Sequence, residues 1–152
     1  HKIIKCIHIS NSITASFDNK NLYYADTYKK LIYKTSLYKN KPYIKNANIF
    51  VDNSNVSGFP DGSTVDSNNT LWNAEWNGGQ VAQYDKNGKI ISKIKTPMKK
   101  PTCVAFGGPN MNKLFITSAK DINSNEDDTS GKTICIQMNV KGQLSNRFIL
   151  NS

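Results

Sequence analysis

The chain has 152 residues, a length typical of one domain, and its hydrophobic fraction of 38% is enough for a core. Its formal net charge of +9 comes from 20 basic residues, of which only Arg147 is an arginine. Nucleic-acid binders usually cluster arginine and lysine on one face. Here the lysines are spread through the turns, so we expect a solvated surface with no nucleic-acid partner. A weaker alternative is attraction of an anionic substrate or partner.

The cysteines and the ends of the chain bear on its compartment. Cys6, Cys103 and Cys135 each stand between apolar neighbours, and none forms a CxxC pair, so we expect buried free thiols in the cytoplasm. No apolar run is long enough to span a membrane, and the first residues do not resemble a signal peptide. The sequence begins at His1 rather than at methionine, which leaves the natural N-terminus open.

Short alternating runs separated by turn residues fill the chain, and helical periodicity is almost absent, which predicts an all-β fold. In chain order, the expected strands are Ile7–Ala15, Asn21–Ala25, Lys30–Ser36, Ala47–Asp52, Gly62–Asp66, Thr70–Glu75, Gln80–Asp85, Ile90–Thr96, Thr102–Phe106, Lys113–Ser118 and Thr133–Asn139.

The strands fall into three repeats. Aligned copies start at Asn11, Asp61 and Pro101, and the segment Leu71–Ala74 matches Leu22–Ala25. Four short strands in about 40 to 50 residues are typical of propeller blades. We therefore expect one domain over 1–152: a partial β-propeller of about three four-stranded blades starting near residues 7, 60 and 101, the last with a weak or missing outer strand. Three blades cannot close a ring, so we expect the other half to be on another polypeptide or to be lost.

The repeats give Asn11 and Asp61 equivalent positions. Each begins the innermost strand of its blade, and Asp61 stands between Pro60 and Gly62. Equivalent positions surround the channel of a propeller, so one amide and one carboxylate would meet at its mouth. Such oxygen ligands suit calcium, magnesium or manganese. The alternative is that both residues only cap turns.

Several segments together resemble the C-terminal half of the senescence-marker-protein/gluconolactonase family, which includes regucalcin and bacterial sugar lactonases. The similarity runs through most of the chain. Its segments are Ile9–Asn11, Tyr24–Thr27, Pro60–Gly62, Val65–Asp66, Leu71–Ala74, Asn77–Gly79, Pro101–Thr102, Phe106–Pro109, Leu114–Ala119, Gly142 and Arg147–Phe148.

The resemblance implies a six-bladed propeller holding one divalent ion: calcium, zinc, manganese or magnesium. It assigns Asn11 and Asp61 as metal ligands, and Asp61 also as the catalytic acid and base of lactone ring opening. The family's third ligand, a glutamate, belongs to the missing half. This chain departs from the pattern at Ser12, where the family usually has glycine, and at Phe17, where it often has proline.

The expected function is metal-dependent hydrolysis of a sugar lactone, with an active unit completed by an N-terminal half or by a second copy. The alternative is a non-catalytic remnant that keeps the fold without activity, so whether this chain is itself an enzyme stays open. No substrate-binding residue is assigned. We expect association through open flanks that expose apolar side chains, namely Ile13, Tyr23, Phe115 and Ile134.

Three other residues are expected to be structural. Trp72 and Trp76 flank a strand end, where packing is favoured over stacking on a substrate. His8 is a lone histidine, which is more often a partnered structural residue than a metal ligand.

Overall fold

The structure, a computed structural model, describes residues 4–37, 47–120 and 129–144. It confirms the predicted all-β class: in these ranges eleven antiparallel strands form three sheets, and there is no helix. In those ranges there is accordingly no helix that could cross a membrane. Arg147–Phe148, from the family's ending, lies outside the described residues.

The strands follow one another in each sheet in chain order. The first sheet contains β1 (Ser10–Ala15), β2 (Asn21–Asp26), β3 (Leu31–Ser36) and β4 (Asn48–Asp52). The second contains β5 (Phe59–Val65), β6 (Leu71–Trp76), β7 (Gln80–Tyr84) and β8 (Ile90–Lys95). The third contains β9 (Pro101–Gly107), β10 (Lys113–Ser118) and β11 (Thr133–Gln137) within the described part of the chain. Each expected strand is present, with ends shifted by a few residues.

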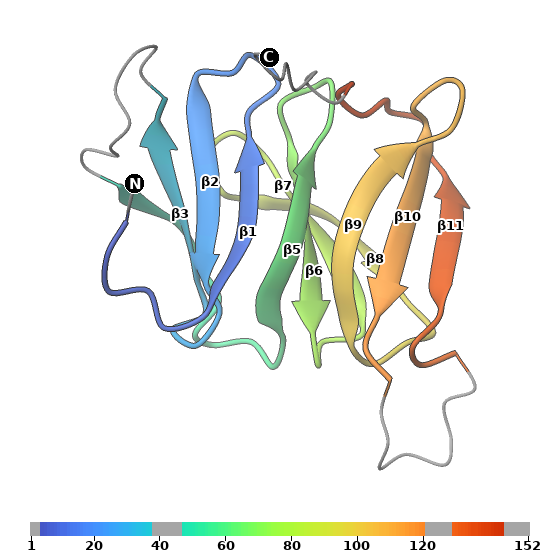
Figure 1. Ribbon diagram of the computed structural model, residues 1–152, viewed down its shortest axis with the longest axis horizontal. Helices are drawn as coiled ribbons and strands as arrows, with labels where there is room; N and C mark the ends of the chain where they lie inside the picture. The colour runs from blue at the N-terminus through green and yellow to red at the C-terminus, as the bar shows by residue number, and fades with distance from the viewer. Residues whose placement is uncertain (1–3, 38–46, 121–128, 145–152) are drawn as a thin grey trace, which may run out of the picture.

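The first strands of the three sheets, β1, β5 and β9, lie side by side across the middle of the molecule (Figure 1). Each has an irregular register close to its start, between Asn11 and Thr14 in β1 and between Pro60 and Ser63 in β5. Such bulges bend a strand locally and redirect its side chains. Asn11 and Asp61 therefore stand at matching irregularities of neighbouring strands.

The pairing corrects the alignment of the third repeat by one residue. Pro60 pairs with Glu75 just before the irregularity of β5, and Pro101 pairs with Ser118 just before that of β9. Pro101 therefore occupies the position of Pro60, and Thr102 occupies that of Asp61. The Thr102 hydroxyl lies 2.8 Å from the hydroxyl of Thr117 on the next strand.

Two hydrophobic clusters hold the sheets together. One joins the first and second sheets, and its members are Tyr23, Ala25, Ile32, Val51, Val65, Leu71, Ala82 and Tyr84. The other joins the second and third sheets, and its members are Trp72, Ala74, Val81, Met98, Val104, Leu114 and Ile116. Each cluster fills a seam, the layer of side chains between two neighbouring sheets.

The structure corrects part of the expected apolar flank. Tyr23 is buried in the first seam, where its ring lies 5.0 Å from that of Phe50. Ile134 is partly buried and packs against the second cluster. Only Ile13 and Phe115 of the four are exposed, at 68% and 37% of their surface.

The cysteine prediction was wrong on burial. Cys6, Cys103 and Cys135 are free, but all three are exposed. In a strand, successive side chains point to opposite faces, so the buried Val104 next to Cys103 places that cysteine outward. The apolar residues on either side of Cys103 in the sequence therefore led to the wrong prediction of its burial.

Trp72 and His8 both have the partners that are expected of structural residues. Trp72 is buried, and its Nε1 donates a hydrogen bond of 2.9 Å to the buried carboxylate of Asp66. His8 Nδ1 lies 3.1 Å from the buried Asp26 Oδ2, and the His8 ring stacks on Tyr28. Trp76 packs edge to face on Phe59, with ring centroids 5.8 Å apart.

Candidate functional site

Asp61 lies in the irregular part of β5 and is partly buried. Burial raises the pKa of its carboxyl group from 3.8 to about 6. The hydrogen bond from the backbone N–H of Gly62 lowers this pKa, but it offsets only part of the effect of burial. Desolvation penalises the charged form of a carboxylate, whereas a nearby cation would favour it. Asp61 is therefore a carboxylate whose charged form a bound cation would stabilise.

Asn11 lies on β1 and is also partly buried. Its Nδ2 donates a hydrogen bond of 3.0 Å to Thr27 Oγ1, and Thr27 Oγ1 donates one of 2.7 Å to the carbonyl oxygen of Pro60. The Asn11 side chain is thus linked by two hydrogen bonds to the peptide group that leads into Asp61. With Nδ2 used in this way, the amide oxygen of Asn11 is the atom left to bind a ligand.

A second set of polar groups joins the same two strands. The hydroxyls of Ser12 and Ser63 are in hydrogen-bond contact across the first seam. Asn73 Nδ2 donates to Ser63 Oγ at 2.9 Å and to the carbonyl oxygen of Asp61 at 3.0 Å. Ser12 and Asn73 are both buried. The backbone of Asp61 is therefore held from β6 and, through the serines, from β1.

Thr27, Ser63 and Asn73 were not identified from the sequence. One signal was available for Asn73, because it interrupts the apolar segment Leu71–Ala74 of an expected core strand. A polar residue at a buried strand position normally has a hydrogen-bond partner to satisfy. Its partners, Ser63 and the backbone of Asp61, depend on the bulge in the neighbouring strand β5, which strand patterns do not contain.

On its other side, β5 packs closely against β9. A Cβ atom added to Gly62 would lie 2.5 Å from Cys103 Sγ and 2.8 Å from Cys103 Cα, so only glycine fits there. Although Cys103 contacts solvent, partial burial of its thiol and then the negative charge of Asp61 raise its pKa. Cys103 is therefore a neighbour of Asp61 contributed by the third sheet.

The donor set can be tested for its fit to a divalent cation. A carboxylate and an amide oxygen are hard ligands of the kind that calcium, magnesium and manganese prefer. Within the described ranges, no group of three or more His, Cys, Asp or Glu side chains could hold a metal ion. Asn11 and Asp61 thus fit part of an oxygen-ligand site, which needs at least one further ligand from outside them.

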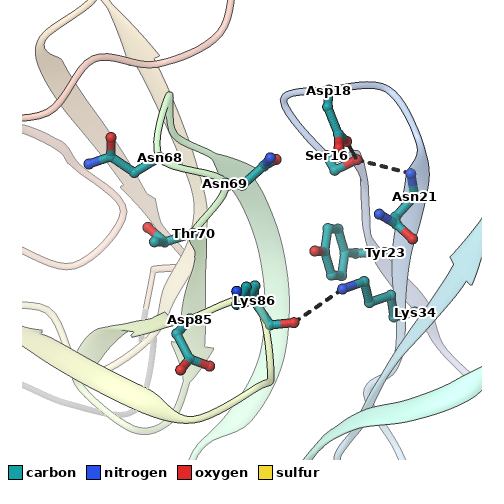
Figure 2. Close-up of a pocket in the computed structure, with 10 residues that line it drawn as sticks. All are labelled: Ser16, Asp18, Asn21, Tyr23, Lys34, Asn68, Asn69, Thr70, Asp85 and Lys86. Carbon is teal, nitrogen blue, oxygen red and sulfur yellow. Dashed lines mark hydrogen bonds between the residues drawn. The ribbon is translucent and has the colours of Figure 1, made fainter.

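A separate polar cleft of about 560 Å³ lies between the first and second sheets (Figure 2). It is lined from one side by residues such as Asp18 and Lys34, and from the other by residues such as Asp85 and Lys86. Its lining includes neither Asn11 nor Asp61. Asp18 and Asp85 accept hydrogen bonds from backbone N–H groups of their own turns, so these carboxylates serve the turns.

Comparison with known proteins gives a consistent set of relatives. Residues 1–120 match the family described as SMP-30/Gluconolactonase/LRE-like region. The chain is 33% identical over 113 residues to the pentonolactonase XacC of Haloferax volcanii, covering 74% of this chain and 39% of that protein. It is 31% identical over 144 residues to the L-arabinolactonase of Azospirillum brasilense, covering 92% of this chain and 47% of that protein.

The fold matches a solved structure as well. The crystal structure of regucalcin from Agrobacterium tumefaciens, described as a calcium-binding protein, superposes with a TM-score of 0.88 at 32% identity. The match covers 95% of this chain and 50% of that protein. The chain therefore spans about half, or less, of the length of these relatives.

Proposed function

Because the chain belongs to the SMP-30/gluconolactonase/LRE-like family, we propose that it supplies one half of a metal-dependent sugar lactonase. The observation that carries the proposal is the hydrogen-bonded link from Asn11 through Thr27 to the peptide before Asp61, beside a partly buried carboxyl group of raised pKa. That arrangement supports a site shared by one amide and one carboxylate, the two groups that the family resemblance assigns to the metal.

We further propose that the three sheets are three blades of a six-bladed β-propeller. Their first strands lie side by side, as inner strands do around a channel, and a related protein of known structure is twice as long as the matched region. A complementary half, or a second copy related by a two-fold axis, would complete the ring. The third protein ligand of the metal would come from that half. The expected location in the cytoplasm stays a prediction.

In the proposed reaction, a bound divalent ion would supply polarisation of the lactone carbonyl and a water molecule of lowered pKa. Asp61 takes a proton from the attacking water as its oxygen bonds to the carbonyl carbon. The carbonyl carbon then releases the ring oxygen, and Asp61 returns the proton to it, giving a hydroxy acid. Asn11 binds through its amide oxygen and moves no proton at neutral pH.

A non-catalytic remnant is the second candidate function, favoured by one observation: among the described residues the site has only two ligand candidates. The gene sequence upstream distinguishes between these two candidate functions. An adjacent reading frame that encodes three further blades, with a glutamate near its start, favours the split enzyme. Its absence favours the remnant.

The isolated chain is expected to hydrolyse aldonolactones at or near the uncatalysed rate, because two protein ligands bind and orient a metal poorly. Adding the complementary half is expected to restore turnover that is lost with a chelator. Acid release in a pH-stat, with and without the second polypeptide, measures both. Robust metal-dependent turnover by the pure isolated chain would show that the second half is dispensable.

Three blades of an incomplete propeller leave two flanks uncovered, which predicts association with another chain. Ile13 and Phe115 are exposed on the first and third sheets, and unpaired sheet edges favour pairing with another chain. We expect the purified chain to form a dimer, or a complex with a separate first half, in multi-angle light scattering at micromolar concentration. A monodisperse monomer with one cooperative unfolding transition would contradict this expectation.

A further inference from the structure

Two hydrogen-bonded paths connect β1 with β5 next to Asn11 and Asp61. Together they close a hydrogen-bonded ring. The first path leaves the Asn11 side chain and reaches the carbonyl oxygen of Pro60 through Thr27. The second leaves the residue after Asn11, where Ser12 contacts Ser63, and reaches the carbonyl oxygen of Asp61 through Asn73. The two paths therefore end on successive peptide groups, one on each side of the Asp61 α-carbon.

Asn73 is the branch point of the second path. Its Nδ2 has two N–H donors, and both are used, one for the serine hydroxyl of β5 and one for the backbone of Asp61. Reversing the amide would place its oxygen against the carbonyl oxygens of Asp61 and Gly62, which are both acceptors. The orientation of the side chain is thus fixed by the bulge that carries Asp61.

Both ends of the second path carry a stability cost. Asn73 Oδ1 is buried and accepts no hydrogen bond from a described residue, which is unfavourable for a polar atom removed from water. Ser12 has a φ of +62°, in the left-handed region that favours glycine. Residues kept against local stability rules are characteristic of functional sites.

We propose that Asn73, acting through Ser63 and Ser12, is a positioning residue that sets the separation of Asn11 and Asp61 across the seam between two sheets. This inference rests on the proposed metal-binding function of that pair. Hydrophobic packing also joins the sheets, but apolar contacts are non-directional. The hydrogen-bonded ring adds the directional constraint that a pair of ligands on separate sheets needs.

The test uses the purified 152-residue chain, Mn²⁺ alone as the probe, and the NMR signal of the Asn11 side-chain amide. Mn²⁺ is expected to broaden this signal in the unmodified chain and not in Asp61→Asn. Asn73→Val is expected to weaken the apparent Mn²⁺ affinity about tenfold or more, the range found when groups supporting metal ligands are removed. It is also expected to shift the Asn11 amide signal before any metal is added.

Two comparisons distinguish a positioning role from an effect on overall stability: Asn73→Val with Val81→Ala, and Ser63→Ala with Ser63→Thr. Val81→Ala removes apolar volume from the other seam and should lower the melting temperature without changing the Mn²⁺ affinity. Ser63→Ala should weaken Mn²⁺ binding as Asn73→Val does, whereas Ser63→Thr keeps the hydroxyl and should restore it. The serine pair carries the test if Asn73→Val does not fold.

The two proposals fail in different ways. Absence of Asp61-dependent broadening in the unmodified chain overturns the metal site, while the metal-free Asn11 signal still tests the ring. The positioning proposal is overturned if Ser63→Ala and every folded Asn73 variant keep both the metal-free Asn11 signal and the Mn²⁺ response of the unmodified chain. It is equally overturned if Val81→Ala changes the Mn²⁺ affinity as strongly as they do.

Discussion

Asp61→Asn is expected to lower lactone turnover by about 10²- to 10⁴-fold in the assembly of this chain with its complementary half, the range for loss of a positioned acid or base. Asparagine keeps the shape of aspartate and one oxygen that can bind a cation. It cannot take a proton from water or return one to the ring oxygen. The loss should therefore appear mainly in kcat, with a smaller change in KM.

The matched control for this variant is Asp18→Asn. Asp18 is an exposed carboxylate in the turn between β1 and β2, where it accepts hydrogen bonds from Ser16 Oγ and the backbone of Lys20. The substitution removes the same charge without touching β5, so turnover should stay within about twofold of the unmodified assembly. Turnover of Asp61→Asn at the level of this control would show that Asp61 is not the base, and would leave the remnant as the better description.

The strands were predictable because their local rules agree. In the segment Leu71–Ala74, a short and mainly apolar run that contains Trp72 favours a strand, and Asn77–Gly79 supplies the turn that ends it. The repetition of this pattern gave the grouping into sheets and the equivalence of Asn11 with Asp61. The matching registers of β1 with β2 and of β5 with β6 reproduce that equivalence.

The seams between sheets were less predictable, because they depend on which face of a strand meets the next sheet. Tyr23 was expected on an open flank, but β2 turns that face toward the second sheet, where Val65 and Leu71 cover it. Cys103 was expected inside, but alternation along β9 gives the inward position to Val104. Residues that are adjacent in sequence point to opposite faces of a strand, so apolar neighbours do not show that a strand residue is buried.

The candidate site likewise has a part that the sequence predicts and a part that it does not. Asn11 and Asp61 were found because they repeat along the chain. Asn73 and Thr27 do not occupy repeated polar positions: the register places Tyr24 of β2 where β6 has Asn73. Their partners lie in another sheet or across a bulge, and no periodic pattern encodes those contacts.

Gly88→Ala is expected to destabilise the chain by about 3 kcal/mol, from about 1–2 kcal/mol for a left-handed backbone and about 1–3 kcal/mol for steric overpacking. Gly88 has a φ of +84° in the turn between β7 and β8. A Cβ atom added there would lie 2.0 Å from the carbonyl oxygen of Phe50, on β4 of the neighbouring sheet. Since this contact is with backbone, the first and second sheets must move apart to relieve it.

Gly79→Ala is the matched control, because it isolates the backbone contribution. Gly79 has a φ of +62°, but the nearest atom to an added Cβ is the carbonyl oxygen of Met98 at 3.8 Å, an ordinary contact. It should therefore cost only about 1–2 kcal/mol. Urea unfolding followed by the fluorescence of the buried Trp72 gives both free energies of unfolding. Equal losses in the two variants would mean that the seam at Phe50 yields without cost, and that close contact between β4 and the β7–β8 turn does not hold these two sheets together.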